Sequence, residues 1–476
     1  MGEMTDDDLA GIREEILRLT RIYSGATHFQ NRPAYDARPP LFEPGVTTVP
    51  YAGRVFDTDE VAAGVESMLD FWLTLGPRGA EFERDLASYL GVRKSLLTNS
   101  GSSANLLALS ALTSHKIQGF KRLRPGDEVI TVAAGFPTTV APIVQCGATV
   151  VFIDADPITG NARCDQLWEV YKPGKTKAVI LAHALGNPFD IARTKEFCDT
   201  NGIWLIEDNC DALGSRYNSQ LTGSFGDLST QSFYPPHHLT LGEGGAVNII
   251  NNARLKVLVE SFRDWGRDCW CPSGVDNTCN KRFCWQLGDL PEGYDHKYTY
   301  SHLGYNLKPL DLQAAIGSQQ LKKLPNFVTA RQQNWQTLRA GLDECSDVLE
   351  FSLPTHATAW NSDGSFTWDE SGNTVECSWF GFKMSVKPNA KFTRTDLVKH
   401  LDACKIGNRM LFGGNLMRQP AFVQLKKDSP KSIRVVSDLK GSDEIMNNTV
   451  FIGVYPGLTE QMLDYVINSI KAFVHK

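Results

Sequence analysis

The chain has 476 residues, of which 42% are hydrophobic and 21% are charged, and its formal net charge is -6. This length allows a large core with at least one further lobe, and the composition is that of an ordinary globular protein. The acidic balance, with a pI of about 6.0, offers no basic stripe to meet a phosphate backbone, so no nucleic-acid partner is expected.

The N-terminal part predicts a helix followed by an extended arm, over residues 1–56. Residues 6–23 carry Leu9, Ile12 and Ile16 among charges, which indicates an amphipathic helix. Prolines from Pro33 to Pro50 then interrupt regular structure. No apolar signal region follows the acidic start and no apolar run approaches about 18 residues, so we expect a cytoplasmic protein without a membrane span.

From residue 57 the chain alternates helical segments with short β-branched runs. The predicted helices are 60–75 and 80–90, and the predicted buried strands are 128–132, 149–153, 178–182 and 204–206. Strands separated by helices favour a mostly parallel sheet covered on both faces. We therefore predict an α/β fold with a large domain over residues 57–325.

The rest of the chain, residues 326–476, predicts a smaller α/β domain. Long helices are predicted at 312–324, before this boundary, and at 327–342, and the later elements are helices 395–405 and 459–473 with strands 378–386 and 450–454. Residues 355–374 are rich in Ser, Gly, Asp, Asn and Trp, which favours a surface hairpin or loop.

Two segments of the large domain have the composition of ligand sites. Small polar residues, with Gly101 and Ser102 among them, open an apolar helix, where free N–H groups suit a phosphate, although such turns are also common helix caps. The strand at 204–206 runs into Asp208, and ligands bind at the carboxyl ends of strands in open α/β sheets. The alternative interpretation makes Asp208 the N-cap of the next helix.

The chain has eleven cysteines, which in a reducing compartment are core residues or ligands rather than disulfides. Four of them crowd the segment 265–285, namely Cys269, Cys271, Cys279 and Cys284. A structural zinc bound by these four is one reading, but their spacing lacks paired Cys-x2-Cys knuckles.

The stretch Ser232-Phe233-Tyr234-Pro235-Pro236-His237-His238, followed by Gly242-Glu243-Gly244-Gly245, resembles the cofactor-lysine segment of the DegT/DnrJ/EryC1/StrS sugar aminotransferases. These enzymes bind pyridoxal phosphate (PLP), so the resemblance implies the PLP-dependent transferase fold of type I, the aspartate aminotransferase-like fold. His237 stands where that family carries its lysine. An imidazole transfers protons but cannot hold the cofactor covalently.

The resemblance also implies a set of cofactor contacts. These are Gly101, Ser102 and Ser232 at the phosphate, Asp208 at the pyridinium nitrogen, Phe136 on the ring, and Asn306 reaching the phosphate of a neighbouring subunit. The last contact implies a homodimer. Arg409 and Arg418 lie in a segment that resembles the part of the small domain near the sugar nucleotide, where arginine suits a diphosphate, or else they form surface ion pairs.

The histidine and its neighbours resemble one subgroup, the 4-keto-6-deoxyhexose 3-dehydrases of nucleotide-sugar pathways. This implies removal of the C3 hydroxyl of a nucleotide-linked sugar with free pyridoxamine phosphate (PMP), His237 being the proton-transfer base. His238 is expected to face away, and His296 and His302 either approach the cofactor or a cluster or have structural roles.

Formation of a deoxy sugar by this reaction requires two electrons, and the cysteine spacing indicates a source for them. Cys269-x-Cys271-x7-Cys279 with a remote Cys210 resembles the [2Fe-2S] ligands of the iron-sulfur members. Such a cluster implies a partner, an NAD(P)H-dependent flavin/iron-sulfur reductase. The alternatives are a glutamate-recycled dehydrase or aminotransferase without a cluster, and a non-catalytic scaffold that binds the cofactor or nucleotide sugar.

Overall fold

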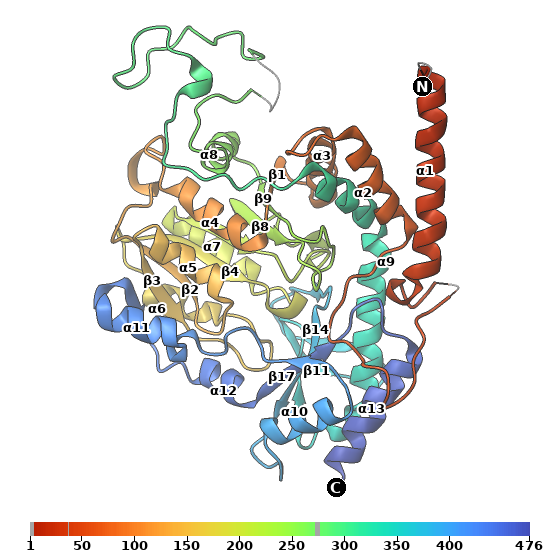
Figure 1. Cartoon of the computed structure of the whole chain (residues 1–476). Coiled ribbons are helices and arrows are strands. Elements are labelled where there is room, and N and C mark those ends of the chain that lie inside the picture. Colours follow the sequence, from red (N-terminus) through yellow and green to blue (C-terminus); the bar gives the residue numbers. More distant parts are fainter. Residues whose placement is uncertain (1–3, 37, 272–276) are drawn as a thin grey trace.

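A computed structural model describes residues 4–36, 38–271 and 277–476 (Figure 1). Its larger sheet has the strand order β1-β9-β8-β5-β4-β2-β3-β16. Only β9 runs antiparallel to its neighbours β1 and β8, and the other pairs are parallel. The predicted mostly parallel sheet is confirmed.

The bounds of these strands are β1 Lys94–Thr98, β2 Glu128–Val132, β3 Thr149–Ile153, β4 Thr176–Ala182, β5 Trp204–Asp208, β8 Leu228–Ser232, β9 Gly245–Ile249 and β16 Ile433–Val435. The helices of this part are α2 Thr58–Asp70, α3 Pro77–Leu90, α4 Gly101–Leu112, α5 Pro137–Gln145, α6 Leu167–Val170, α7 Ile191–Asn201 and α8 Ala253–Arg263. A small three-stranded sheet beside it consists of β6 Arg216–Tyr217, β7 Gln220–Leu221 and β13 Val375–Glu376.

The sheet has a hydrophobic core on each face. Val129 and Val150, which pair across β2 and β3, belong to one buried cluster, whereas the next residues, Ile130 and Val151, belong to the other. Since successive side chains of a strand point to opposite faces, the two clusters lie on opposite sides of the sheet. Burial on both faces explains why apolar residues do not alternate with polar ones along the middle of these strands.

A four-stranded antiparallel sheet forms the smaller part, drawn at the bottom of Figure 1. Its strands are β10 Leu349–Phe351, β14 Gly381–Val386, β15 Asn408–Arg409 and β17 Thr449–Gly453, and the helices of this part are α10 Arg394–Ala403, α11 Pro420–Asp428, α12 Lys440–Asn448 and α13 Glu460–Val474. The predicted hairpin within 355–374 is confirmed as β11 Ala357–Trp360 paired with β12 Phe366–Trp368.

One helix, α9 Asp311–Gly341, replaces the two helices predicted at 312–324 and 327–342. Pro325 lies inside it and removes one backbone hydrogen bond. Residues on both sides of the proline, including Leu324, Phe327 and Trp335, are buried in the core, so packing holds the helix continuous.

The predicted domain boundary at residue 325 therefore falls inside a single helix. In addition, β16 from the C-terminal part pairs with β3 at the edge of the large sheet. Helix α9 and strand β16 therefore both join the large and the small part of the chain.

The N-terminal helix α1 Asp6–Thr27 lies beside α2 at the right edge of Figure 1. The arm after it reaches the small domain, where Val49 forms an isolated bridge with Ile406. Within the described part of the chain, no helix is long and apolar enough to cross a membrane.

Candidate active site

A pocket of about 330 Å³ opens where β5 and β8 end and α4 and α5 begin. Its lining includes six of the residues predicted for cofactor binding or catalysis, although they are widely spaced in the sequence: Gly101, Ser102, Phe136, Asp208, Ser232 and His237. The small domain adds Arg409 and Phe412 to the wall. A cavity of this size at strand ends suits a small cofactor with part of a substrate.

The first turn of α4 approaches the end of β8 closely. A Cβ atom on Gly101 would lie 2.4 Å from the Cβ of Ser232, and one on Gly245 would lie 2.4 Å from the carbonyl carbon of Ser100. Glycine is therefore required at both positions for the strands to reach the helix N-terminus. The Gly101 turn and the Ser232 side chain together form a cradle of N–H and hydroxyl donors suited to a phosphate.

Gly101→Ala should damage this cradle, because the new methyl group would meet Ser232 side-chain and backbone atoms. We expect a loss of about 1–3 kcal/mol in the free energy of unfolding, together with weaker PMP binding, measured by thermal unfolding and equilibrium dialysis. Gly11→Ala is the matched control, since its Cβ meets nothing within 4 Å and alanine favours a helix interior. Parental stability and PMP affinity in Gly101→Ala would contradict the assignment.

Asp208 ends β5 as a buried carboxylate. Its Oδ2 accepts hydrogen bonds from Asn105 Nδ2 at 2.8 Å and from Thr139 Oγ1 at 2.7 Å. The other oxygen, Oδ1, accepts a 3.3 Å bond from the Cys210 amide. One carboxylate oxygen is thus fixed by the protein while the other has acceptor capacity left for a ring N–H.

Phe136 and Ser102 mark the entrance side of the pocket. Phe136 is the N-cap of α5 and remains half exposed, and Ser102 Oγ donates to Thr138 Oγ1 at 3.0 Å. An exposed aromatic ring beside an anion cradle is available to stack on a flat ligand.

His237 reaches the pocket from the loop after β8. Its Nδ1 lies 3.2 Å from the Tyr234 carbonyl oxygen and its Nε2 lies 3.5 Å from Asp211 Oδ1. His238 is buried, and its Nε2 lies 2.7 Å from the Ser378 carbonyl oxygen. Burial lowers the pKa of His238 well below its usual value. As expected, His238 faces away from the pocket.

Of the two arginines predicted near the substrate, only Arg409 lines the pocket. Arg409 lines the pocket with its guanidinium 4.2 Å from the Tyr51 ring centroid. Arg418 lies outside that lining, pairs with Asp443 at 2.8 Å and leaves 58% of its side chain exposed. Of the two readings, a surface ion pair describes Arg418 in this structure.

Asn306 lies outside the pocket of its own chain. Its segment runs along α4, with Tyr305 OH 3.4 Å from Ser110 Oγ and the Leu307 carbonyl bonded to the Asn99 amide at 2.7 Å. Lys308 Nζ donates to Asn306 Oδ1 at 2.9 Å. The role inferred for Asn306 at a neighbouring subunit stays a prediction.

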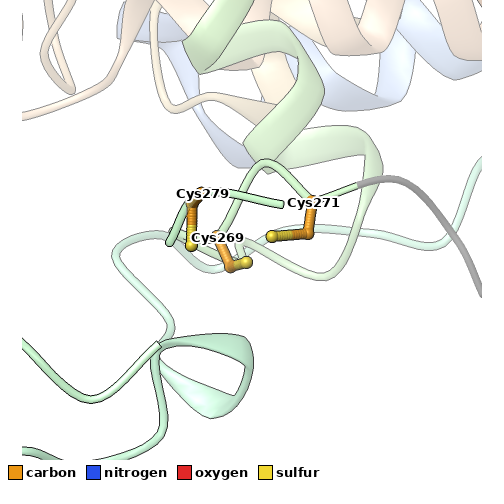
Figure 2. A group of neighbouring side chains, drawn as sticks. All are labelled: Cys269, Cys271 and Cys279. Atoms are coloured by element: carbon orange, nitrogen blue, oxygen red, sulfur yellow. The ribbon is translucent and has the colours of Figure 1, made fainter. Parts of the chain in front are cut away.

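Three cysteines of the Cys-rich segment converge. Figure 2 shows the sulfur atoms of Cys269, Cys271 and Cys279 turned toward one another, and all three lie within 4.8 Å of each other. Burial opposes ionisation of Cys271, but hydrogen bonds from Thr278 and the neighbouring thiols outweigh it and lower its pKa to about 7. Three thiols so close suit a thiophilic metal centre. Cys284 is exposed and lies outside the group.

Cys210, the predicted fourth ligand, does not join this trio in the structure. It lines the cofactor pocket next to Asp208, which is held by Asn105 near the start of α4. The trio instead follows Asp268, whose carboxylate accepts from Lys116 beyond the end of α4 at 2.6 Å. From Asn105 to the end of α4 at Leu112 the helix rises about 10 Å, at 1.5 Å per residue, so Cys210 and the trio are held near different ends of this helix.

The two remaining histidines have structural partners. His302 lies between two hydroxyls, with Nε2 2.7 Å from Ser114 Oγ and Nδ1 2.8 Å from Ser261 Oγ. His296 is fully buried, and its Nε2 lies 3.2 Å from Asp268 Oδ1. His296 thereby supports the chain next to the cysteine trio.

Sequence reasoning missed several residues of the site. Asn105 and Thr139 fix Asp208, Tyr51 comes from the N-terminal arm, and Asp211 faces His237. Only Asp211 had a visible clue, as a further acidic residue directly after Cys210. The others are common residue types that tertiary folding alone brings to the pocket.

The mostly parallel sheet carries a phosphate cradle, a buried carboxylate at a strand end and an exposed aromatic ring. This combination is that of the PLP-dependent transferase fold. Residues 56–471 match the model of the DegT/DnrJ/EryC1/StrS aminotransferase family. The chain belongs to this family, as predicted from the sequence.

The similar proteins of known name include nucleotide-sugar 3-dehydratases, as predicted. The chain is 48% identical over 462 residues to the lipopolysaccharide biosynthesis protein RfbH of Salmonella typhimurium, covering 97% of this chain and 98% of that protein. It is 48% identical over 437 residues to a dTDP-4-dehydro-2,6-dideoxy-D-glucose 3-dehydratase of Saccharopolyspora spinosa, covering 92% and 89%.

Among solved structures, the chain resembles GDP-4-keto-6-deoxymannose-3-dehydratase, solved as a mutant with bound GDP-perosamine. The TM-score is 0.73 at 26% identity, covering 88% of this chain and 99% of that one. This agreement confirms the predicted fold class.

Proposed function

We propose that the protein removes the C3 hydroxyl of a nucleotide-linked 4-keto-6-deoxyhexose, using PMP and a [2Fe-2S] cluster. The observation that carries this proposal is His237, which lines the pocket where the family carries its lysine. No lysine lines the pocket among the described residues. The relatives named as 3-dehydratases support the same reaction class.

The residues of the pocket fit PMP. Gly101, Ser102 and Ser232 would hold its phosphate, Asp208 its ring nitrogen and Phe136 its ring face. When bound, the cofactor supplies an electron sink conjugated with the C4 position of the sugar. Arg409 also lines the pocket, and a guanidinium there suits the diphosphate of the nucleotide.

His237 supplies the proton transfers. Both ring nitrogens face acceptor oxygens, but Nδ1 lies 3.2 Å from the Tyr234 carbonyl whereas Nε2 lies 3.5 Å from Asp211, so we assign the proton of the neutral ring to Nδ1. Nε2 then carries the free lone pair and acts as the base. The same nitrogen, once protonated, can assist departure of the C3 hydroxyl as water.

The cysteine trio supplies the site for a cluster. Overall, loss of the C3 hydroxyl as water and its replacement by hydrogen consumes two electrons and two protons. We propose that an NAD(P)H-dependent flavin/iron-sulfur reductase delivers these electrons through the cluster, one at a time. We propose Cys210 as the fourth thiolate, which requires the trio to approach the pocket from the same chain or from a second copy of a homodimer.

Oxygen exchange tests the reaction class. The protein with PMP, a nucleotide-linked 4-keto-6-deoxyhexose and ¹⁸O-labelled water should incorporate label at C3, detected by mass spectrometry. Trials should span the common nucleotide carriers. Absence of exchange with every carrier would favour a non-catalytic binding protein, and transfer of the amino group to the sugar would favour an aminotransferase.

A further inference from the structure

Two charged residues, Asp211 and Arg331, contact His237 and have no role in the reaction proposed above. Asp211, in the turn after β5, places Oδ1 3.5 Å from His237 Nε2, and both side chains are largely shielded, at 12% and 16% exposed. Arg331 of α9 is buried and donates from Nη2 to the His237 carbonyl oxygen at 3.2 Å. These contacts hold both ends of the same residue.

The ring of His237 has one orientation consistent with these contacts. Its Nδ1 is engaged by the Tyr234 carbonyl, and its face packs against Phe380 at a centroid distance of 5.4 Å. Turning the ring over would put carbon atoms in the positions of both ring nitrogens and remove both contacts. The remaining nitrogen, Nε2, is therefore the one that faces both the carboxylate and the pocket.

Arg331 connects this arrangement to the small domain. Its Nη1 donates to the Trp379 carbonyl oxygen at 3.1 Å, while Nη2 holds the His237 carbonyl. Burial lowers the pKa of Arg331 to about 9, and the Asp211 carboxylate opposes this shift. Other titratable groups around His237 are His238 in the same loop and, in the pocket wall, Tyr51, Asp208, Cys210, Tyr234 and Arg409.

We propose that Asp211 is a positioning residue, which orients the His237 imidazole and supplies the counter-charge once Nε2 has taken a proton. This inference rests on the proposed function, because it assigns the base to His237. A neutral Nε2 has no hydrogen to share with a carboxylate, but a protonated Nε2 donates to it, so the contact is stronger after proton transfer than before. An interaction of this kind raises the rate rather than the affinity for substrate.

The test uses Asp211→Asn, which keeps the size of the side chain but removes its charge and adds a donor that can occupy the Nε2 lone pair. We expect kcat for C3 oxygen exchange to fall on the order of 100-fold, while KM and PMP affinity stay near the parental values. Asp211→Glu retains the carboxylate and should recover most of the rate.

A second readout does not depend on turnover. In ¹⁵N NMR of the free protein with labelled histidine, Asp211→Asn should shift the Nε2 resonance of His237, which His237→Asn identifies by its loss. An unchanged Nε2 resonance, or an unchanged kcat while His237→Asn is inactive, would overturn the role of Asp211. Retained exchange in His237→Asn would instead overturn the proposed base, so the two failures are distinguishable.

Discussion

His237→Asn should bind PMP normally and lose C3 oxygen exchange by at least about 100-fold, the lower end of what a general base contributes. Asparagine has a similar size but no group that gains and loses a proton near neutral pH. The phosphate cradle and Asp208 lie on other elements, so cofactor affinity, measured by equilibrium dialysis, should not change. The ¹⁸O assay measures the exchange rate directly.

The control for this variant is His115→Asn, the same change at an exposed histidine outside the pocket lining. Its ring contacts only the structural His302 among the described ring pairs. Exchange at the parental rate is expected there. Exchange retained within tenfold in His237→Asn would assign the proton transfer to another group that lines the pocket, with Asp211 the nearest candidate.

Much of the fold follows from local sequence because its main strands are buried on both faces. The runs at 128–132 and 149–153 are mostly β-branched and apolar, and their predicted bounds match β2 and β3 residue for residue. The prediction failed at Pro325, where local sequence favoured a break and core packing kept α9 continuous. The pairing of β16 with β3 in the large sheet could not be predicted from the sequence either. The strand has only three residues, and nothing in them indicates a partner so far away in the chain.

The residues of the candidate site likewise fall into those that the sequence could predict and those that it could not. Gly101, Asp208 and His237 belong to motifs whose order in the chain is informative. Asn105 and Thr139, which fix Asp208, lie on two different helices and look like ordinary helix residues in the sequence. Their role depends on how α4 and α5 pack against β5, which no local pattern encodes.

Cys271→Ser and Cys279→Ser should each abolish iron binding, because removing one thiolate from a group whose sulfurs lie within 4.8 Å of one another leaves too few ligands for the cluster. Cys284→Ser is the matched control in the same segment and should retain iron, since Cys284 lies outside the trio. Iron and acid-labile sulfide, measured on anaerobically purified protein, are the readouts. Stoichiometric zinc without iron in the parent protein would overturn the iron-sulfur proposal.

Cys210→Ser should also lose iron if Cys210 supplies the fourth thiolate, although it lies in the pocket wall at the other end of α4 from the trio. Mixed dimers of Cys210→Ser and Cys271→Ser subunits then decide where that thiolate comes from. If each cluster takes its trio from one copy and Cys210 from the other, one of the two sites in a mixed dimer is complete and about half of the iron returns. If both come from one chain, every site lacks a ligand and none returns. Full iron retention in Cys210→Ser alone would exclude Cys210 and leave the fourth ligand to another group near the trio.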